Sequence, residues 1–432
     1  MRRTHAMVLV LLVSLTSLSA RVAYAQPHSR TEALTVEALV QRALAENGEL
    51  QAARAEIDAA HGQLRQAGLR PNPMLDLSVQ QSITGPDNNL VIGVTVPLDL
   101  GGRKAGRVGV AEQALLHTQA QVANQERRLR ADVRLKAGEI LAATRNLHVT
   151  EDLVAVNRHA LDLLRTRVRQ GAVPALDERL LLVEVHRLEA SRTLLESQVE
   201  VLTLQAKTLA GLDPEVSLAL TGDLRPVPVP FARDAGVAKA LAARPDLQVA
   251  RTEVAMAEAG MRQERAEGRW DASVNVGYMR QNFGYDLRGL TERGDTQPIH
   301  DIFHYVGGGV TITLPLRNQN QGNIAAALAE IAAAKRRHTF LTLALRQEVI
   351  AAFTQHEAAA RALDIYTHGV RDVARENVAV VRRAYELGRL SLLDLIAEQR
   401  RYLEVETGYT EALKQVYNAA VDVEHAVGAL DR

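Results

Sequence analysis

Two helical patterns of great length constrain the fold of this 432-residue chain more than any other feature. Apolar residues recur every seven positions over residues 103–170 and again over residues 320–387, which is 68 residues in each case. At 1.5 Å per residue, a helix of that length measures roughly 100 Å. A rod of this size does not fit a globular domain, so the patterns predict a mainly α-helical chain of long antiparallel coiled coils.

In each predicted coiled coil, the apolar residues that recur every seven positions form a seam along one side of the helix, and the two seams differ in regularity. The first pattern is reset once by a four-residue step, which locally unwinds a coil without ending it. Its seam residues are Val108, Leu115, Val122, Leu129, Val133, Ile140, Leu147, Val154, Leu161 and Val168. The second pattern keeps one register through Ile324, Ile331, His338, Leu345, Ala352, Ala359, Tyr366, Val373, Val380 and Leu387. We interpret His338 as a polar layer in that seam and not as a ligand.

Similar phrases recur along the chain and indicate an internal two-fold repeat. TVPLDL at 95–100 corresponds to TLPLRN at 313–318, and RQGAVPALDE at 169–178 corresponds to ELGRLSLLDL at 386–395. Corresponding positions in these phrases are about twenty residues further apart than corresponding positions nearer the start of the two repeats. This difference predicts an inserted loop near residues 282–299. We divide the chain into a first repeat over 26–212, a Pro-rich non-helical linker over 213–234 and a second repeat over 235–432.

Each repeat is predicted to run helix, strand, loop, strand, long helix, turn and shorter helix. The strands show period-two alternation, with apolar residues such as Leu75, Leu77 and Val79 between polar ones. Helix lengths predict that 175–211 and 235–268 lie end to end along the first long helix. By the same reasoning, 392–428 and 35–68 should lie along the second one.

Residues 1–25 have the features of a cleaved signal peptide, with Arg2 and Arg3, an apolar stretch and a final Ala-Tyr-Ala. The chain has no cysteine, so we expect neither disulfides nor a lipid anchor. Its 51 basic and 51 acidic residues cancel, which argues against a nucleic-acid partner. Later segments are too polar for a membrane-spanning helix.

Four short strands cannot close a membrane barrel, because the smallest such barrels have about eight. An open sheet would present unpaired backbone groups to hydrocarbon, which is costly. We therefore expect the chain to share its sheet with copies of itself in a bacterial outer membrane.

The two-copy plan, the phrase LPLRNQNQGNI at 314–324 and the ending AVDVEHAVG at 420–428 resemble the TolC family of outer-membrane efflux ducts, most closely the branch for cobalt, zinc and cadmium. The resemblance implies a homotrimer in which each chain gives four strands to a twelve-stranded transmembrane β-barrel, continued by a helical tunnel in the periplasm. It also implies a periplasmic adaptor and an inner-membrane pump as partners. Pro97 and Pro315 would mark the elbow between strand and helix.

The same resemblance assigns roles to the two turns between helices. Contacts with the adaptor would be made by Arg169, Gly171, Ala172, Val173, Gly388, Arg389 and Leu390. The closed gate would be formed by Asp177, Asp394 and Glu398, although the family's further acidic position corresponds to Ala397, one residue before Glu398. Two simpler interpretations stay open. The glycines are common turn residues, and Asp394 after Ser391 could serve as a helix cap.

No catalytic motif stands out, so we expect no enzyme activity, cofactor or resident metal. His300 and His304 are the closest pair of histidines in their part of the chain and are interpreted as surface residues of a loop. Two alternative functions remain. One is a duct of the same fold for drug or protein export, and the other is a periplasmic coiled-coil adaptor or scaffold.

Overall fold

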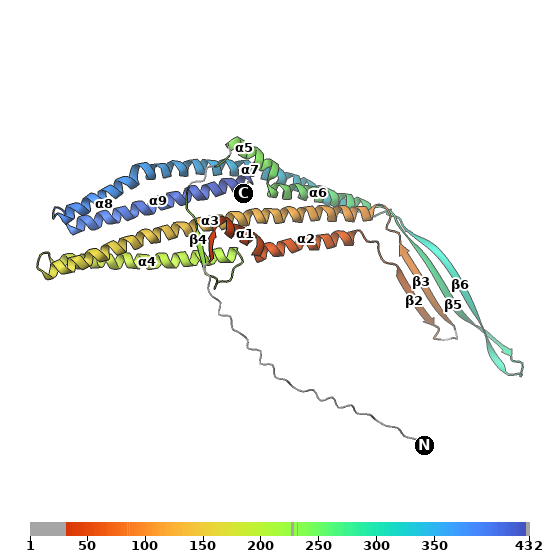
Figure 1. Ribbon diagram of the computed structural model, residues 1–432. Helices are drawn as coiled ribbons and strands as arrows, with labels where there is room; N and C mark the ends of the chain where they lie inside the picture. Colours follow the sequence, from red (N-terminus) through yellow and green to blue (C-terminus); the bar gives the residue numbers. More distant parts are fainter. Residues whose placement is uncertain (1–31, 84, 86, 226–228, 231, 429–432) are drawn as a thin grey trace, which may run out of the picture.

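The computed structural model describes residues 32–428 apart from 84, 86, 226–228 and 231. The predicted signal peptide therefore lies outside the described residues. The helices form a long rod, and the larger group of strands leaves one end of it as a curved ribbon (Figure 1). The expectation of a mainly helical, elongated chain with a small β part is confirmed.

The first predicted long helix is present almost as expected. α3 runs from Arg103 to Arg169 without interruption. It packs against α4 (Ala175–Leu209) and α6 (Pro245–Glu267), which follow one another along its length. The predicted seam is correct for α3, whose buried residues include Leu115, Val122, Leu129, Val133, Ile140, Val154 and Leu161.

The second predicted long helix is interrupted. α7 (Gln321–Ile365) passes through one π-helical turn (Tyr366–Val370) into α8 (Arg371–Glu386). A π turn holds one residue more than an α turn, and the buried face moves forward by one position. Ala374 and Val378 are buried, whereas Val380, a predicted seam residue, is 67% exposed. The predicted register is therefore wrong beyond residue 366, since Val373 and Leu387 are also exposed.

The shorter helices are broken where continuous helices were expected. α1 (Val36–Glu46) and α2 (Gly48–Ala67) are separated by Asn47, and α5 (Arg233–Ala243) is separated from α6 by Arg244. The Asn47 side chain accepts a hydrogen bond from the Leu50 amide at 2.9 Å and so caps α2. At the second break, Pro245 occupies the first turn of α6, a position that proline favours.

One predicted packing arrangement is also wrong. α9 (Leu392–Val427) lies along α7 and α8 as expected. α2 packs against α3, however, and not along the second long helix. Helix length predicts which segments match in extent, but the choice of neighbour depends on side-chain packing between distant segments.

Two sheets are present in the described part of the chain. β1 (Glu32–Thr35) pairs in parallel with β4 (Leu218–Thr221), so the predicted linker contains a short strand. The larger sheet is antiparallel, with the order β2 (Met74–Gln81), β3 (Asn88–Pro97), β5 (Asp271–Leu290) and β6 (Thr296–Thr313). β2 and β6 form its two edges.

The prediction of a loop at 282–299 is wrong. These residues extend β5 and β6 into a hairpin that continues beyond the ends of β2 and β3 (Figure 1). Asp301 pairs with Phe283, and Thr296 pairs with Leu290. Turn-forming residues such as Gly284 and Gly289 suggested a loop, but ladder pairing across the hairpin overrides that local preference.

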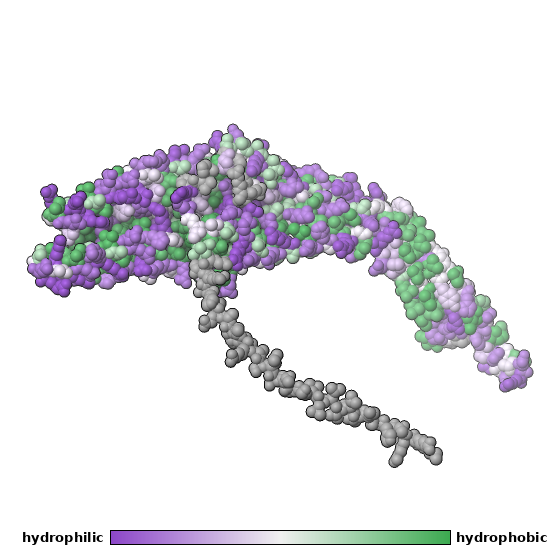
Figure 2. Space-filling model, viewed as in Figure 1, coloured by the Kyte–Doolittle hydropathy of each residue, from purple (hydrophilic) through white to green (hydrophobic). Residues whose placement is uncertain are grey.

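The larger sheet has two chemically distinct faces. Cross-strand partners share a face, and Leu77, Ile92, Tyr278 and Val306 are paired in a row across all four strands. The row one position away along β2 is Asp76, Gly93, Gly277 and Gly307. Figure 2 shows apolar residues gathered over this sheet. Leu77 and Val306 are 67% and 82% exposed, so the apolar face lacks cover within the chain.

Candidate functional site

The turns that end α3 and α8 have the same backbone geometry. Gly171 and Gly388 both have φ of +70°, a left-handed conformation that costs other residues roughly 1–2 kcal/mol. After each glycine, the next amide donates to a carbonyl five residues back. These bonds run from Ala172 to Arg167 and from Arg389 to Ala384, both at 2.9 Å. This is the Schellman arrangement, in which glycine closes a helix.

The helix after the second turn begins with a capping box. The Ser391 hydroxyl accepts from the Asp394 amide at 3.3 Å, and the Asp394 carboxylate accepts from the Ser391 amide at 2.9 Å. Hydrogen bonds from the Ser391 hydroxyl and amide lower the pKa of Asp394. The capping interpretation of Asp394 is therefore confirmed. Its carboxylate is also exposed at the end of the rod.

The two turns lie together at one end of the rod (Figure 1). A hydrophobic cluster joins their hairpins and contains Leu161, Leu164, Leu181, Val185, Leu392, Leu395 and Ile396. Of the residues expected to contact an adaptor, Val173 packs against this cluster. The exposed ones are Arg169, Gly171, Ala172, Gly388, Arg389 and Leu390.

A cavity of about 260 Å³ lies behind the turns, between α3, α4, α8 and α9. Tyr385 lines it, and burial raises the pKa of that phenol, with a further contribution from the Asp177 carboxylate. The Asp177 carboxylate of the first hairpin thus acts electrostatically on Tyr385 of the second.

Glu398 occupies a different setting from the other two acidic residues. It is 8% exposed, and one carboxylate oxygen accepts from Arg401 at 3.1 Å. Its other oxygen has no hydrogen-bond partner among the described residues. Glu398 is therefore part of the hairpin interior, whereas Asp394 is exposed.

An ion-pair network links the two hairpins and was not predicted from the sequence. Buried Glu184 of α4 pairs with Arg187 at 2.6 Å and with Arg400 of α9 at 2.7 Å. Burial favours the neutral acid, but hydrogen bonds from Arg187 and Arg400 outweigh it and lower the pKa of Glu184. The i, i+3 spacing of Glu184 and Arg187 was visible in the sequence. The link to Arg400, 216 residues away, carried no local signal.

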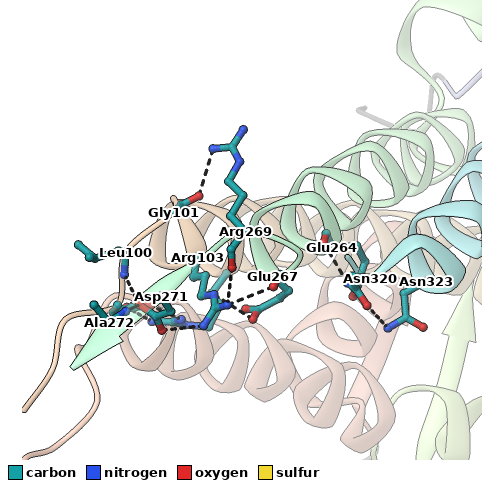
Figure 3. A network of polar contacts seen from close by, with 12 residues as sticks. Leu100, Gly101, Arg103, Glu264, Glu267, Arg269, Asp271, Ala272, Asn320 and Asn323 are labelled. Carbon is teal, nitrogen blue, oxygen red and sulfur yellow. Dashed lines mark hydrogen bonds and ion pairs between the residues drawn. The ribbon is translucent and has the colours of Figure 1, made fainter. Parts of the chain in front are cut away.

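At the opposite end of the rod, polar contacts fix the junction between strands and helices (Figure 3). Arg103, the first residue of α3, pairs with Asp271 at 2.6 Å and with Glu267 at 3.3 Å. Asp271 also accepts from the Leu100 amide at 3.0 Å. These contacts connect the start of α3 to the end of α6 and the start of β5.

The two predicted elbow prolines lie at this junction. Pro97 is the last residue of β3, and Pro315 comes two residues after β6. Beyond Pro97, Asp99 and Gly101 adopt positive φ values of 53° and 73°. The Asp99 carboxylate is bound by Arg107 at 2.7 Å, and that hydrogen bond lowers the pKa of Asp99. The prolines end the strands, and the positive-φ residues turn the chain into α3.

The histidines form no metal-ligating group in the described residues, where clusters of three or more His, Cys, Asp or Glu are absent. His300 and His304 lie on β6, not in a loop. The His304 Nδ1 atom is 2.7 Å from the Tyr278 hydroxyl, and the two rings are stacked.

None of the helices in the described part of the chain has the length and apolar character needed to cross a membrane.

Comparison with known proteins gives consistent relatives. The chain is 24% identical over 402 residues to the cobalt-zinc-cadmium resistance protein CzcC of Cupriavidus metallidurans, covering 93% of this chain and 92% of that protein. The structure of CusC matches with a TM-score of 0.73 and 15% identity over 94% of this chain and 95% of that one. The outer membrane protein VceC from Vibrio cholerae matches with a TM-score of 0.70 and 18% identity, covering 91% and 96%.

These relatives agree with the resemblance that the sequence motifs indicated. The two structural likenesses concern the fold, because both identities are below 25%. The model of the outer membrane efflux protein family matches residues 39–210 and 236–429, which is most of the chain. With its four amphipathic strands joined to a rod of long helices, this chain belongs to the outer membrane efflux protein family.

Proposed function

We propose that three copies of this chain form a passive exit duct in the outer membrane. The observation that carries this proposal is the four-stranded sheet, which has one exposed apolar face and two edges without a partner strand in the described chain. Pairing β2 of one copy with β6 of the next would satisfy both edges and close a ring of twelve strands. The ring would place the apolar face toward lipid.

The helical rod would continue the barrel as a tunnel in the periplasm. A periplasmic adaptor would bind the turns through Arg169, Gly171, Ala172, Val173, Gly388, Arg389 and Leu390. Support comes from the shared Schellman geometry of the two turns and from the exposure of most of these residues. A passive duct supplies no energy of its own and needs no catalytic group. The energy for transport would therefore come from an inner-membrane pump.

The gate would lie at the same end, with Asp177, Asp394 and Glu398 as its acidic residues. Asp394 is exposed, whereas Glu398 would reach the tunnel only if α9 turned about its axis. Binding of the adaptor would shift the turns from a closed to an open arrangement by loosening contacts between neighbouring coils.

The proposed cargo is heavy-metal cations, because the relative CzcC bears the name of a cobalt-zinc-cadmium resistance protein. A strain lacking this chain should become sensitive to cobalt, zinc or cadmium and should recover when the gene is restored. Sensitivity to drugs with unchanged metal tolerance would favour the alternative duct for drug export.

Assembly is tested separately from cargo. Outer-membrane fractions should contain a heat-resistant species three times the mass of the mature chain on a gel. Release of a monomer by salt, or its recovery with the inner membrane, would favour a coiled-coil adaptor and contradict the barrel.

A further inference from the structure

The apolar face of the sheet ends at the strand-helix junction with a tryptophan. Trp270 directly precedes β5, and the alternation along that strand places it on the face of Ala272 and Val274. It is 51% exposed and is the chain's only tryptophan. Tryptophan concentrates at membrane-water interfaces, where its ring contacts both apolar and polar surroundings.

Acidic residues of the junction are engaged within the chain. Asp99 is paired with Arg107, and Asp271 and Glu267 are paired with Arg103. Glu264 accepts a hydrogen bond from the Asn320 side chain at 2.6 Å (Figure 3). Arg107 and Arg103 thus compensate two of these four carboxylates. The charge of Glu264, which is bound by a neutral amide, and that of Glu267, which shares Arg103 with Asp271, remain.

Several basic residues near the strand-helix junction are exposed. Arg70, Lys104 and Arg317 form no ion pair within 4.0 Å among the described residues. Arg269 donates from Nη1 to the Gly101 carbonyl at 3.1 Å, and Figure 3 shows its side chain directed away from the Arg103 and Asp271 pair. We call Arg70, Lys104, Arg269 and Arg317 the basic belt.

Local contacts hold the belt around one junction. Arg107 of α3 donates to the carbonyl of Leu69, the residue before Arg70, at 3.4 Å. A Cβ atom added at Gly101 would lie 3.1 Å from the Arg269 Cβ. One added at Gly268 would overlap the carbonyl of Gln319, two residues after Arg317. The four cations thus come from chain segments that meet at the end of the apolar face.

We propose that the basic belt and Trp270 bind the anionic headgroups of phospholipids in the leaflet that faces the helical rod. This rests on the proposed function, because the strands must lie in a membrane. Lys and Arg attract anionic lipid near a surface, and guanidinium groups match phosphate oxygens in charge and geometry. The belt would set the depth of the barrel and enrich anionic lipid around it.

The single tryptophan makes the proposal measurable. The mature, full-length protein is placed in phosphatidylcholine vesicles with a small fraction of dansyl-labelled phosphatidylglycerol or dansyl-labelled phosphatidylcholine. We expect energy transfer from Trp270 to be at least about twofold higher for phosphatidylglycerol. Added salt should reduce the difference, since it screens exposed charges.

Charge variants provide the control. The triple variant R70Q/K104Q/R317Q should lower the ratio of the two transfer efficiencies to about one. Replacing three exposed arginines of α7, in R336Q/R346Q/R361Q, should leave the ratio unchanged. A wild-type ratio of one, or the same loss in both triple variants, would overturn the proposal.

Brominated lipids separate this proposal from the barrel itself. Bromines near the headgroup should quench Trp270 in the wild type. Quenching together with equal transfer to both labelled lipids would refute the basic belt and leave the barrel intact. If the protein remains unquenched and forms no heat-resistant trimer in these vesicles, both proposals fail.

Discussion

Gly171 and Gly211 show how much the cost of replacing a glycine depends on the atoms around it. Both have positive φ, of 70° and 67°. A Cβ atom at Gly171 would meet open space, whereas one at Gly211 would overlap the carbonyl of Glu46 at the end of α1. We expect Gly171→Ala to cost about 1–2 kcal/mol from backbone conformation alone. Gly211→Ala should cost more, because α4 and α1 must also separate.

Chemical denaturation of the detergent-solubilised protein measures both free energies of unfolding. The comparison isolates the steric cost, since both variants lose a left-handed glycine. Equal destabilisation by the two variants would contradict the close approach of Gly211 to Glu46.

His425 predicts a pH-dependent stability. Burial, together with the charges of Arg127 and Arg244, lowers the pKa of His425 to about 4. The unfolded chain, with a pKa near 6.5, then binds this proton more readily than the folded one. Stability should therefore fall as pH drops from about 6.5 to about 4. The loss is at most about 3 kcal/mol, less whatever solvent screening removes.

His425→Gln should remove this part of the pH dependence, because glutamine does not titrate. The matched control is His148→Gln, whose side chain is 69% exposed. Thermal unfolding from pH 7.5 to pH 4.5 measures the slopes. An unchanged slope in His425→Gln would show that other groups cause the acid sensitivity.

The π-helical turn between α7 and α8 predicts an asymmetric response to deletion. Removing Gly369 should convert the π turn to an α turn and keep Ala374 and Val378 on the buried face, since a π turn holds one extra residue. Removing Asp152 from continuous α3 should rotate all later residues of that helix by about 100°.

Circular dichroism melting and the heat-resistant oligomer on gels report the outcome. We expect the Gly369 deletion to fold with near-native stability and the Asp152 deletion to lose the oligomer. Similar losses in both would mean that the extra residue at 366–370 is required for packing.

For the whole molecule, neighbouring residues of β2 distinguish the two faces of the sheet. Leu77 lies on the apolar face and Ser78 on the opposite one. A charge facing lipid near the bilayer centre costs about 2–4 kcal/mol, whereas a charge facing the lumen is tolerated. Leu77→Arg should therefore reduce the heat-resistant trimer in the outer membrane, while Ser78→Arg should preserve it. The reverse pattern would invert the proposed orientation.

Much of the fold was predictable because it depends on local periodicity. The seven-residue spacing located α3 to within a residue of its ends, and glycine at positions 171 and 388 located the turns. Alternation of Leu75, Leu77 and Val79 predicted both β2 and its two faces. Prediction was weaker at the hairpin ends, where the burial of Glu398 was not evident from local spacing.

The sequence by itself determined where the long helices and the four strands of the larger sheet begin to form, and which of their residues are apolar. These properties repeat within a few turns and need no distant partner. Tertiary structure alone decided the register beyond Tyr366, the packing of α2 on α3 and the pairing of Glu184 with Arg400. Each of these depends on the shape and charge that a remote segment presents, and local spacing carries no record of that segment.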